Sequence, residues 1–169
     1  MTPADITDPL RPLLYITDSL RTGTLTDADP GIPPLMRTHR LMTGANPFAT
    51  ILRQDLRDLC DRIDTIAGTV PEPSTLADAP RIDRWCGAVV DDLPILVGVV
   101  TGHPRLRQGA RCTTSPLVRI EPDEGWARTF SRFYRLGRPD RSCLTDLLAE
   151  GRMGRDARPF DIPTSGGWT

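Results

Sequence analysis

The stretch of sequence that decides the fold is residues 94–137, which read PILVGVVTGHPRLRQGARCTTSPLVRIEPDEGWARTFSRFYRLG. Residues 94–101 form a short apolar run rich in β-branched side chains, and residues 111–120 form a second run after the turn-like RLRQG. Residues 85–90 have the same character and precede the first run across an Asp-Asp turn. Short connections between such runs are typical of antiparallel strands, so we expect a small meander sheet of three to four strands.

The last part of this stretch, residues 126–136, fits two kinds of structure. A helix would gather its aromatic side chains on one face, whereas a strand would send successive side chains to opposite faces. The aromatic and threonine content and the preceding turn favour the strand. One face then carries Trp126, Arg128, Phe130, Arg132 and Tyr134, and the other carries Ala127, Thr129, Ser131 and Phe133.

The N-terminal part of the chain carries two helical patterns, over residues 8–23 and 46–68. In each, a capping residue followed by proline marks the start and a glycine marks the end. Residues 24–43 contain three prolines and no clear period, so we expect an irregular connection there. Residues 69–80, TVPEPSTLADAP, read as a linker to the strands.

The C-terminal part adds a short helix over residues 142–150 and then a tail over residues 152–169 without periodicity. We therefore expect an α+β fold in which two N-terminal helices pack on a small antiparallel sheet, followed by a short C-terminal helix and a flexible tail. The expected single domain covers residues 1–151, with a helical part at 1–68 and a sheet part at 80–137.

The composition limits the size of the core and the kind of site. The 169 residues are 38% hydrophobic and include 17 Pro and 14 Gly, which predicts a modest core with long connections. All 21 basic residues are arginine, so lysine catalysis is excluded and any anion site uses guanidinium groups.

The two halves of the sequence differ in charge. Residues 1–100 carry a net charge of −5 and residues 101–169 one of +4. Either the basic half meets an acidic partner, or the two halves pack on each other.

The spacing of the cysteines indicates whether the protein binds a metal, and the N-terminal residues indicate where in the cell it is found. The 4 cysteines are widely spaced and form no CxxC, and there are 2 histidines, so we expect no metal and no cofactor. The first ten residues lack the basic and apolar regions of a signal peptide, and no run approaches the roughly 20 apolar residues of a membrane helix. We expect a cytoplasmic protein that makes no membrane contact.

Three side chains are weak candidates for catalysis: His103, Thr114 and Ser115. His103 lies in a Gly-His-Pro turn after a strand, where a histidine can act as a base or bind a phosphate. Thr114 and Ser115 would lie across the hairpin from it. A nucleophile needs a base and an orienting group, but no carboxylate stands near and no Gly-x-Ser-x-Gly is present. A hydrogen-bonded turn histidine is therefore the favoured interpretation.

Arginine and aromatic residues alternate in the basic half, which favours a binding surface. Cations can contact phosphates or carboxylates, and rings can stack on bases. A structural sheet with arginines lying along its surface is the competing interpretation. The candidate partner-binding residues are Arg105, Arg107, Arg111, Trp126, Arg128, Arg132, Tyr134 and Arg135.

A pattern of residues over 98–137 resembles small uncharacterised bacterial and phage-associated proteins. It consists of the Gly-His-Pro turn at 102–104, the Thr-Ser pair at 114–115 and the Thr-x-Ser…Tyr-x-Leu-Gly segment that ends at Gly137. The resemblance implies an accessory role in mobile elements or host–phage conflict, and no activity.

Three functions follow as hypotheses. We favour a non-enzymatic binding protein that contacts a protein or nucleic-acid partner through the arginine and aromatic residues of the sheet. The alternatives are a small hydrolase or nuclease that uses His103 with Thr114 or Ser115, and a structural subunit that oligomerises through the sheet.

Overall fold

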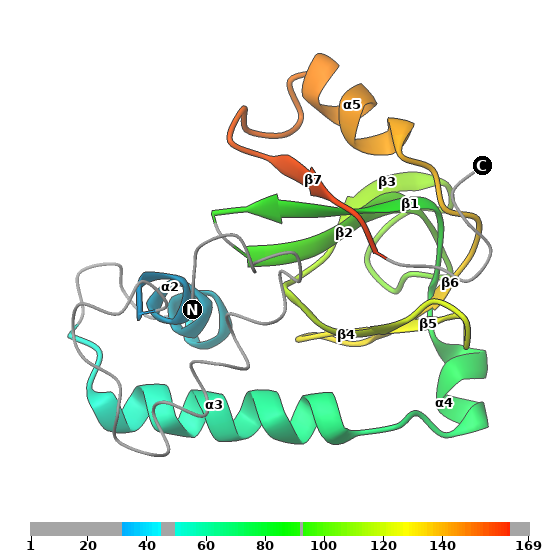
Figure 1. Ribbon diagram of the computed structural model, residues 1–169. Helices are drawn as coiled ribbons and strands as arrows, with labels where there is room; N and C mark the ends of the chain where they lie inside the picture. Colours follow the sequence, from blue (N-terminus) through cyan, green and yellow to red (C-terminus); the bar gives the residue numbers. More distant parts are fainter. Residues whose placement is uncertain (1–31, 45–49, 92, 163–169) are drawn as a thin grey trace. The chain divides into compact units, whose positions relative to one another are not determined.

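The computed structural model describes residues 32–44, 50–91 and 93–162 of the chain (Figure 1). The chain divides into two compact units, Met1–Thr69 and Val70–Thr169, where the sequence predicted a single domain.

The first unit contains the helices α2 (Ile32–Thr43) and α3 (Arg53–Gly68). α3 corresponds to the second predicted helix, but residues 50–52 before it are not helical, and the predicted start at 46–47 lies outside the described residues. The Asp55 carboxylate accepts the Leu52 backbone N–H at 2.8 Å, which satisfies one of the free donors at this end. The buried side chains of α3 follow helical spacing: Leu56, Leu59, Cys60 and Ile63.

The irregular connection predicted over residues 24–43 is wrong from residue 32 onward, because α2 occupies that part. Pro33 and Pro34 lie in the first turn, where a helix makes no use of backbone N–H groups. These prolines therefore permit a helix start, although they hide the helical period. The helix predicted over residues 8–23 lies outside the described residues.

The second unit is built on one mixed sheet of seven strands. Six strands lie in the order β3-β2-β1-β6-β5-β4, and β7 pairs with β1. Two antiparallel meanders, β1–β3 and β4–β6, are thus joined where β1 runs parallel to β6 (Figure 1). The elements in chain order are α4 (Pro73–Asp78), β1 (Arg81–Val90), β2 (Leu93–Thr101), β3 (Ala110–Thr113), β4 (Leu117–Glu121), β5 (Trp126–Thr129), β6 (Phe133–Leu136), α5 (Ser142–Ala149) and β7 (Arg158–Phe160).

The α+β class is confirmed, but the predicted sheet of three to four antiparallel strands is too small. Two runs predicted as single strands are each divided by a turn. The run at 111–120 becomes β3 and β4 because the chain leaves the ladder with β2 after Thr114, and Pro116 has no N–H to donate. The run at 126–136 becomes β5 and β6, with residues 130–132 forming the turn between them.

Two further segments differ from the prediction. The linker predicted over residues 69–80 contains α4, which begins at Pro73, so the helices are not confined to the two ends. In the predicted tail, residues 158–160 form β7, and Ala157 and Ile162 beside it are buried. So short a strand has no recognisable pattern in the sequence, because it is stabilised by its pairing with β1 and not by its own residues. The helix predicted over residues 142–150 is confirmed as α5.

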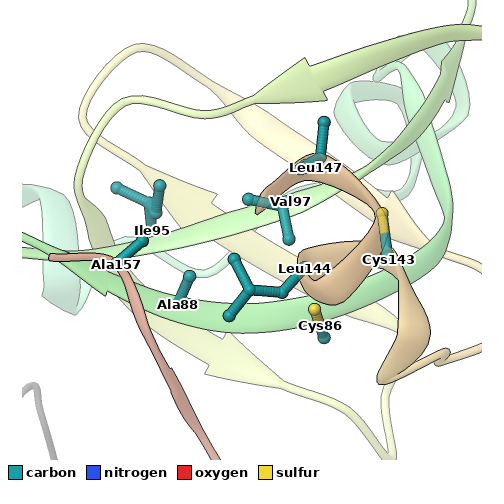
Figure 2. Close-up of a cluster of buried hydrophobic side chains, with 8 residues drawn as sticks. All are labelled: Cys86, Ala88, Ile95, Val97, Cys143, Leu144, Leu147 and Ala157. Atoms are coloured by element: carbon teal, nitrogen blue, oxygen red, sulfur yellow. The ribbon is translucent and has the colours of Figure 1, made fainter. Parts of the chain in front are cut away.

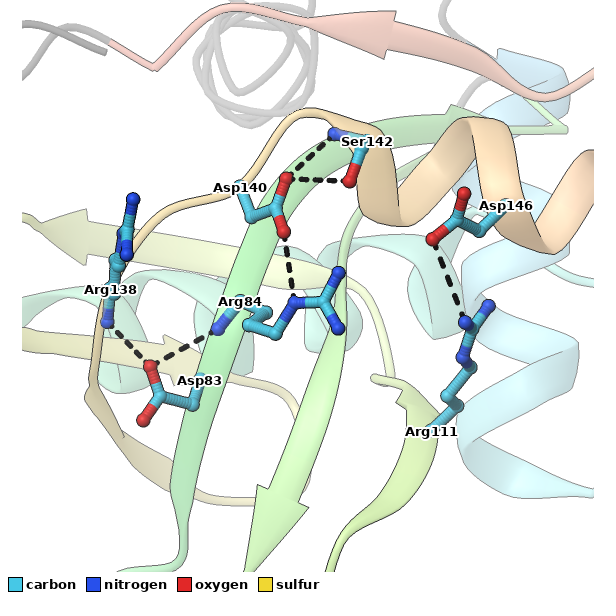
Figure 3. A network of polar contacts seen from close by, with 7 residues as sticks. All are labelled: Asp83, Arg84, Arg111, Arg138, Asp140, Ser142 and Asp146. Carbon is cyan, nitrogen blue, oxygen red and sulfur yellow. Dashed lines mark hydrogen bonds and ion pairs between the residues drawn. The ribbon is translucent and has the colours of Figure 1, made fainter. Parts of the chain in front are cut away.

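A bulge bends β1 after Asp83, where Arg84 has a φ of 47°. Left-handed backbone is strained at a non-glycine residue and needs support from its surroundings. The Asp83 carboxylate supplies it by accepting the backbone N–H groups of Arg84 and Arg138 at 3.2 and 2.7 Å (Figure 3). Arg84 Nε donates to Asp140 at 2.9 Å, and Asp140 accepts the Ser142 N–H at the start of α5. The bulge therefore fixes the segment that leads from β6 into α5.

The main core of this unit lies where α5 packs on β1 and β2 (Figure 2). Leu144 and Leu147 point from α5 toward the sheet, and each fully buried leucine contributes about 1.5–3 kcal/mol. The buried cluster consists of Cys86, Ala88, Ile95, Val97, Cys143, Leu144, Leu147 and Ala157.

Candidate functional site

The register of β4, β5 and β6 places arginine and aromatic residues on one face of the sheet. Arg128 lies opposite both Arg119 and Phe133, and Trp126 lies opposite both Glu121 and Arg135. Directly opposite residues point to the same side of a sheet. We name this set the arginine face: Arg119, Glu121, Trp126, Arg128, Phe133 and Arg135.

The turn at residues 130–132 explains why the predicted alternation is wrong beyond Thr129. A single strand would have placed Tyr134 with Trp126 and Arg128. In the structure Tyr134 lies opposite Ala127, so it faces the other side of the sheet. Phe133 and Arg135 join the arginine face in its place.

The aromatic rings of the arginine face belong to the core. Trp126 and Phe133 are 2% and 9% exposed, and their rings meet edge to face at 5.8 Å. Leu76 of α4 and Ala79 pack against them. Trp126 Nε1 donates to the Glu124 carboxylate at 2.8 Å. These rings are therefore closed to stacking by a base or a partner side chain.

The guanidinium groups cover the rings. Arg128 Cζ lies 4.6 Å from the centre of the Phe133 ring, and Arg119 Cζ lies 5.1 Å from that of Trp126. Arg119 Nε also donates to Glu121 at 2.8 Å, so this charge is partly compensated. Arg135 is exposed, and its Nε donates to the Ala79 carbonyl at 3.0 Å.

Arg128 forms no ion pair with a carboxylate of the described residues. Its Nε is buried and makes no hydrogen bond with any described residue. Burial lowers the pKa of Arg128, yet a guanidinium stays protonated at neutral pH. Arg128 therefore carries a full, partly desolvated charge, which an anionic group from outside would stabilise.

The other predicted partner-binding residues lie elsewhere. Arg105 and Arg107 are exposed on the loop between β2 and β3. Arg111 instead forms ion pairs with Asp146 at 3.6 Å and Glu150 at 3.0 Å, and so ties β3 to α5 (Figure 3). Arg132 lies in the β5–β6 turn. The structure thus brings together Trp126, Arg128 and Arg135 of the eight predicted residues, together with Arg119 and Phe133.

Sequence reasoning missed Arg119 because the run at 111–120 was treated as one strand. The signal that could have found it is the Leu-Val-Arg-Ile-Glu pattern after Pro116, whose arginine and glutamate share one face at strand spacing.

The three weak catalytic candidates do not form a nucleophilic arrangement. Thr114 is buried, its Oγ1 accepts the Leu96 N–H at 3.0 Å, and its hydroxyl donates to the Ser115 carbonyl at 2.8 Å. The hydroxyl proton of Thr114 is thus directed to a backbone carbonyl. His103 Nδ1 accepts the backbone N–H of Arg105 at 3.1 Å, as a turn histidine does.

Ser115 belongs to a cluster of three hydroxyls. Its Oγ lies 3.0 Å from Thr129 Oγ1 and 2.9 Å from Ser131 Oγ, and it accepts the Ser131 N–H at 3.1 Å. The cluster joins the β3–β4 link to the β5–β6 turn. Because its members are distant in the chain, sequence spacing alone does not reveal it.

Within residues 32–44, 50–91 and 93–162, no three His, Cys, Asp or Glu side chains are grouped as a metal site would need. No helix in this part of the chain is long and apolar enough to cross a membrane.

Comparison with known proteins gives one match. Neither a curated protein nor a solved structure matches the chain. A family model, described as a family of unknown function (DUF6634), matches residues 51–158, which include α3, α4, α5 and the whole arginine face. The chain therefore belongs to the DUF6634 family.

Proposed function

We propose that the chain is a non-enzymatic binding protein whose arginine face holds an acidic segment of a partner protein. The observation that carries this proposal is Arg128, a partly desolvated guanidinium over Phe133 whose buried Nε has no hydrogen-bond partner among the described residues. Carboxylates bind guanidinium groups through paired, charge-assisted hydrogen bonds. Arg135, exposed on the same face, supplies a second cation.

An acidic protein segment fits this face better than a nucleic acid does. Nucleic acids bind through phosphate contacts and through base stacking on exposed rings. Here Trp126 and Phe133 are buried, so the stacking contribution is absent from this face.

The hydrolase or nuclease alternative receives less support from the geometry. The Thr114 hydroxyl donates to a carbonyl, and the Nδ1 of His103 is used by the Arg105 N–H. General-base catalysis needs a histidine nitrogen within hydrogen-bond reach of the nucleophile. The proposal includes an accessory role in mobile elements or host–phage conflict, which the resemblance of residues 98–137 implies. It also includes a cytoplasmic location, which is the expectation from the N-terminal sequence.

The test measures binding of two fluorescein-labelled probes by anisotropy: a peptide of ten residues rich in glutamate, and a single-stranded DNA oligonucleotide of equal charge. We expect the peptide to bind and the DNA to bind more weakly. Replacing Arg128 and Arg135 by Gln should weaken peptide binding at least tenfold, since hydrogen bonds to charged groups contribute about 1.5–3 kcal/mol each. Binding should also fall as salt rises.

The matched control is the double variant Arg152→Gln and Arg155→Gln, which removes the same charge from exposed positions after α5. It should bind as the wild type does. Equal losses in both double variants would show a general charge effect and contradict the proposal. Stronger binding of the DNA would favour a nucleic-acid partner instead.

A further inference from the structure

A further arginine lies beside the arginine face, at the start of β1. β1 runs parallel to β6, and Arg81 lies opposite Arg135 in their pairing. Side chains of directly opposite residues point to the same side of a sheet, so Arg81 shares a side with Arg135 and Trp126. The next residues, Ile82 and Leu136, point to the other side, and Ile82 is fully buried there. The parallel junction between the two meanders therefore has an arginine on each of its strands.

Both arginines of this junction are exposed and are held through Nε. Arg81 Nε donates to the Asp83 carboxylate at 3.2 Å, and Arg135 Nε donates to the Ala79 carbonyl at 3.0 Å. The side chain of Arg81 is 47% exposed, and Arg135 is exposed as well. A guanidinium carries further N–H donors on its two Nη atoms, which a bond made by Nε does not occupy. Each side chain is thus restrained while its outer donors stay accessible.

The Asp83 carboxylate compensates only part of the Arg81 charge, because this carboxylate is shared. Its Oδ1 accepts the backbone N–H groups of Arg84 and Arg138, and its Oδ2 accepts Arg81 Nε. Water and salt also weaken an exposed ion pair of this kind. The positive charge of Arg81 is therefore available to a ligand from outside.

The guanidinium of Arg81 reaches from β1 over the end of β6. A Cβ atom placed on Gly137, the residue after β6, would lie 2.9 Å from Arg81 Nη2. Side-chain atoms do not pack this closely, so the glycine makes room for the Arg81 guanidinium. The charge of Arg81 is thus held close to β6, the strand that carries Arg135.

We propose that Arg81 is part of the binding site and that the acidic segment of the partner crosses the junction from β6 to β1. This inference rests on the proposed function, because it names a further residue of the same site. Neighbouring strands lie about 4.8 Å apart, so Arg128 on β5 and Arg81 on β1 are separated by about 10 Å across the strands. An extended segment advances about 3.3 Å per residue, so carboxylates three or four residues apart reach both arginines.

The experiment measures binding of the glutamate-rich, fluorescein-labelled peptide to full-length variants by anisotropy. Arg81→Gln should weaken binding about three- to fivefold, since an exposed ion pair contributes less than a desolvated one. The matched control is Arg84→Gln on the same strand, where the side chain is 54% exposed and its Nε donates to Asp140 instead (Figure 3). This control should bind as the wild type does. Urea denaturation checks that each variant is folded.

The outcomes separate this inference from the proposed function. A folded Arg81→Gln variant that binds as the wild type does, while the double variant at Arg128 and Arg135 binds weakly, would overturn the role of Arg81 and leave the proposed function standing. Equal losses in Arg81→Gln and Arg84→Gln would show a general charge effect and overturn it as well. A wild-type protein that does not bind the peptide would contradict both proposals.

Discussion

Replacing Thr114 by Val should destabilise the second unit, because the Thr114 side chain completes a strand. β3 ends at Thr113, yet the ladder with β2 continues through Thr114. The Thr114 N–H donates to the Leu96 carbonyl at 2.9 Å, and its Oγ1 accepts the Leu96 N–H at 3.0 Å. The hydroxyl oxygen thus takes the place of the next backbone carbonyl, and valine has the same shape without it.

The magnitude follows from the groups that lose a partner. A buried N–H left without an acceptor costs about 1–3 kcal/mol, and the lost bond to the Ser115 carbonyl adds about 0.5–1.5 kcal/mol. The methyl group that replaces the hydroxyl returns about 0.8 kcal/mol if it is fully buried. We expect a net loss of about 2 kcal/mol in the free energy of unfolding.

Urea denaturation followed by tryptophan fluorescence measures this loss, since all 3 tryptophans belong to the second unit. With a slope of about 2 kcal/mol/M, the midpoint should fall by about 1 M. Thr113→Val, at an exposed position next to it, should change the free energy by less than about 0.5 kcal/mol. Thr114→Ser keeps the hydroxyl and should lose less than the valine variant. A Thr114→Val protein within about 0.5 kcal/mol of the wild type would refute the ladder argument.

Three further predictions concern packing, charge and thiol reactivity. Gly98→Ala would place a Cβ 2.7 Å from Ile82 Cγ1 and 2.9 Å from the Asp83 carbonyl, so its urea midpoint should show a loss of about 1–3 kcal/mol. Asp140→Ala should cost about 1 kcal/mol at pH 7 relative to the wild type, by the same assay. A hydrogen bond from the Ser142 hydroxyl and the hydrogen bond and charge of Arg84 lower the pKa of Asp140, so this stabilisation is present at neutral pH. The part that depends on the carboxylate charge is lost as pH falls below about 4, where the difference between the wild type and Asp140→Ala should shrink; a difference as large at pH 2 as at pH 7 would contradict this. Burial raises the pKa of Cys86 to about 12, so iodoacetamide at pH 8 should leave it unmodified in the native protein and label it in urea, as seen by mass spectrometry.

The sequence predicted best those elements whose signals are local. α5 and most of α3 were predicted because a helical period and an end signal coincide in each. β2 was predicted because it is a run of apolar, β-branched residues, and the second half of β1 was predicted from the apolar residues 85–90, whereas its charged first part, residues 81–84, was missed. β7 was missed because three residues carry no period, and its existence depends on pairing with β1. The parallel contact between β1 and β6 was missed for the same reason, since it joins residues about fifty positions apart in the chain.

The candidate site was predicted in composition but not in geometry. The sequence pointed to arginines mixed with aromatic residues in the basic half, and Arg128 and Arg135 do share a face. Whether a ring is exposed or buried depends on what packs over it, and α4 lay in a segment predicted as a linker. Arg111 was predicted to bind a partner, but its charge is used within the chain by Asp146 of α5 and by Glu150 directly after this helix.

The use of arginine in place of lysine has a physical consequence on the arginine face. A planar guanidinium can lie over an aromatic ring and still present N–H groups at its edges, whereas an ammonium group is compact and strongly hydrated. Phe133 is buried, and the group that lies over it, Arg128, is cationic. The same contact thus shields a core ring from water and holds a charge at a defined place on the surface. Packing of the core therefore sets the position of this cation, which a flexible lysine on the same strand would not achieve.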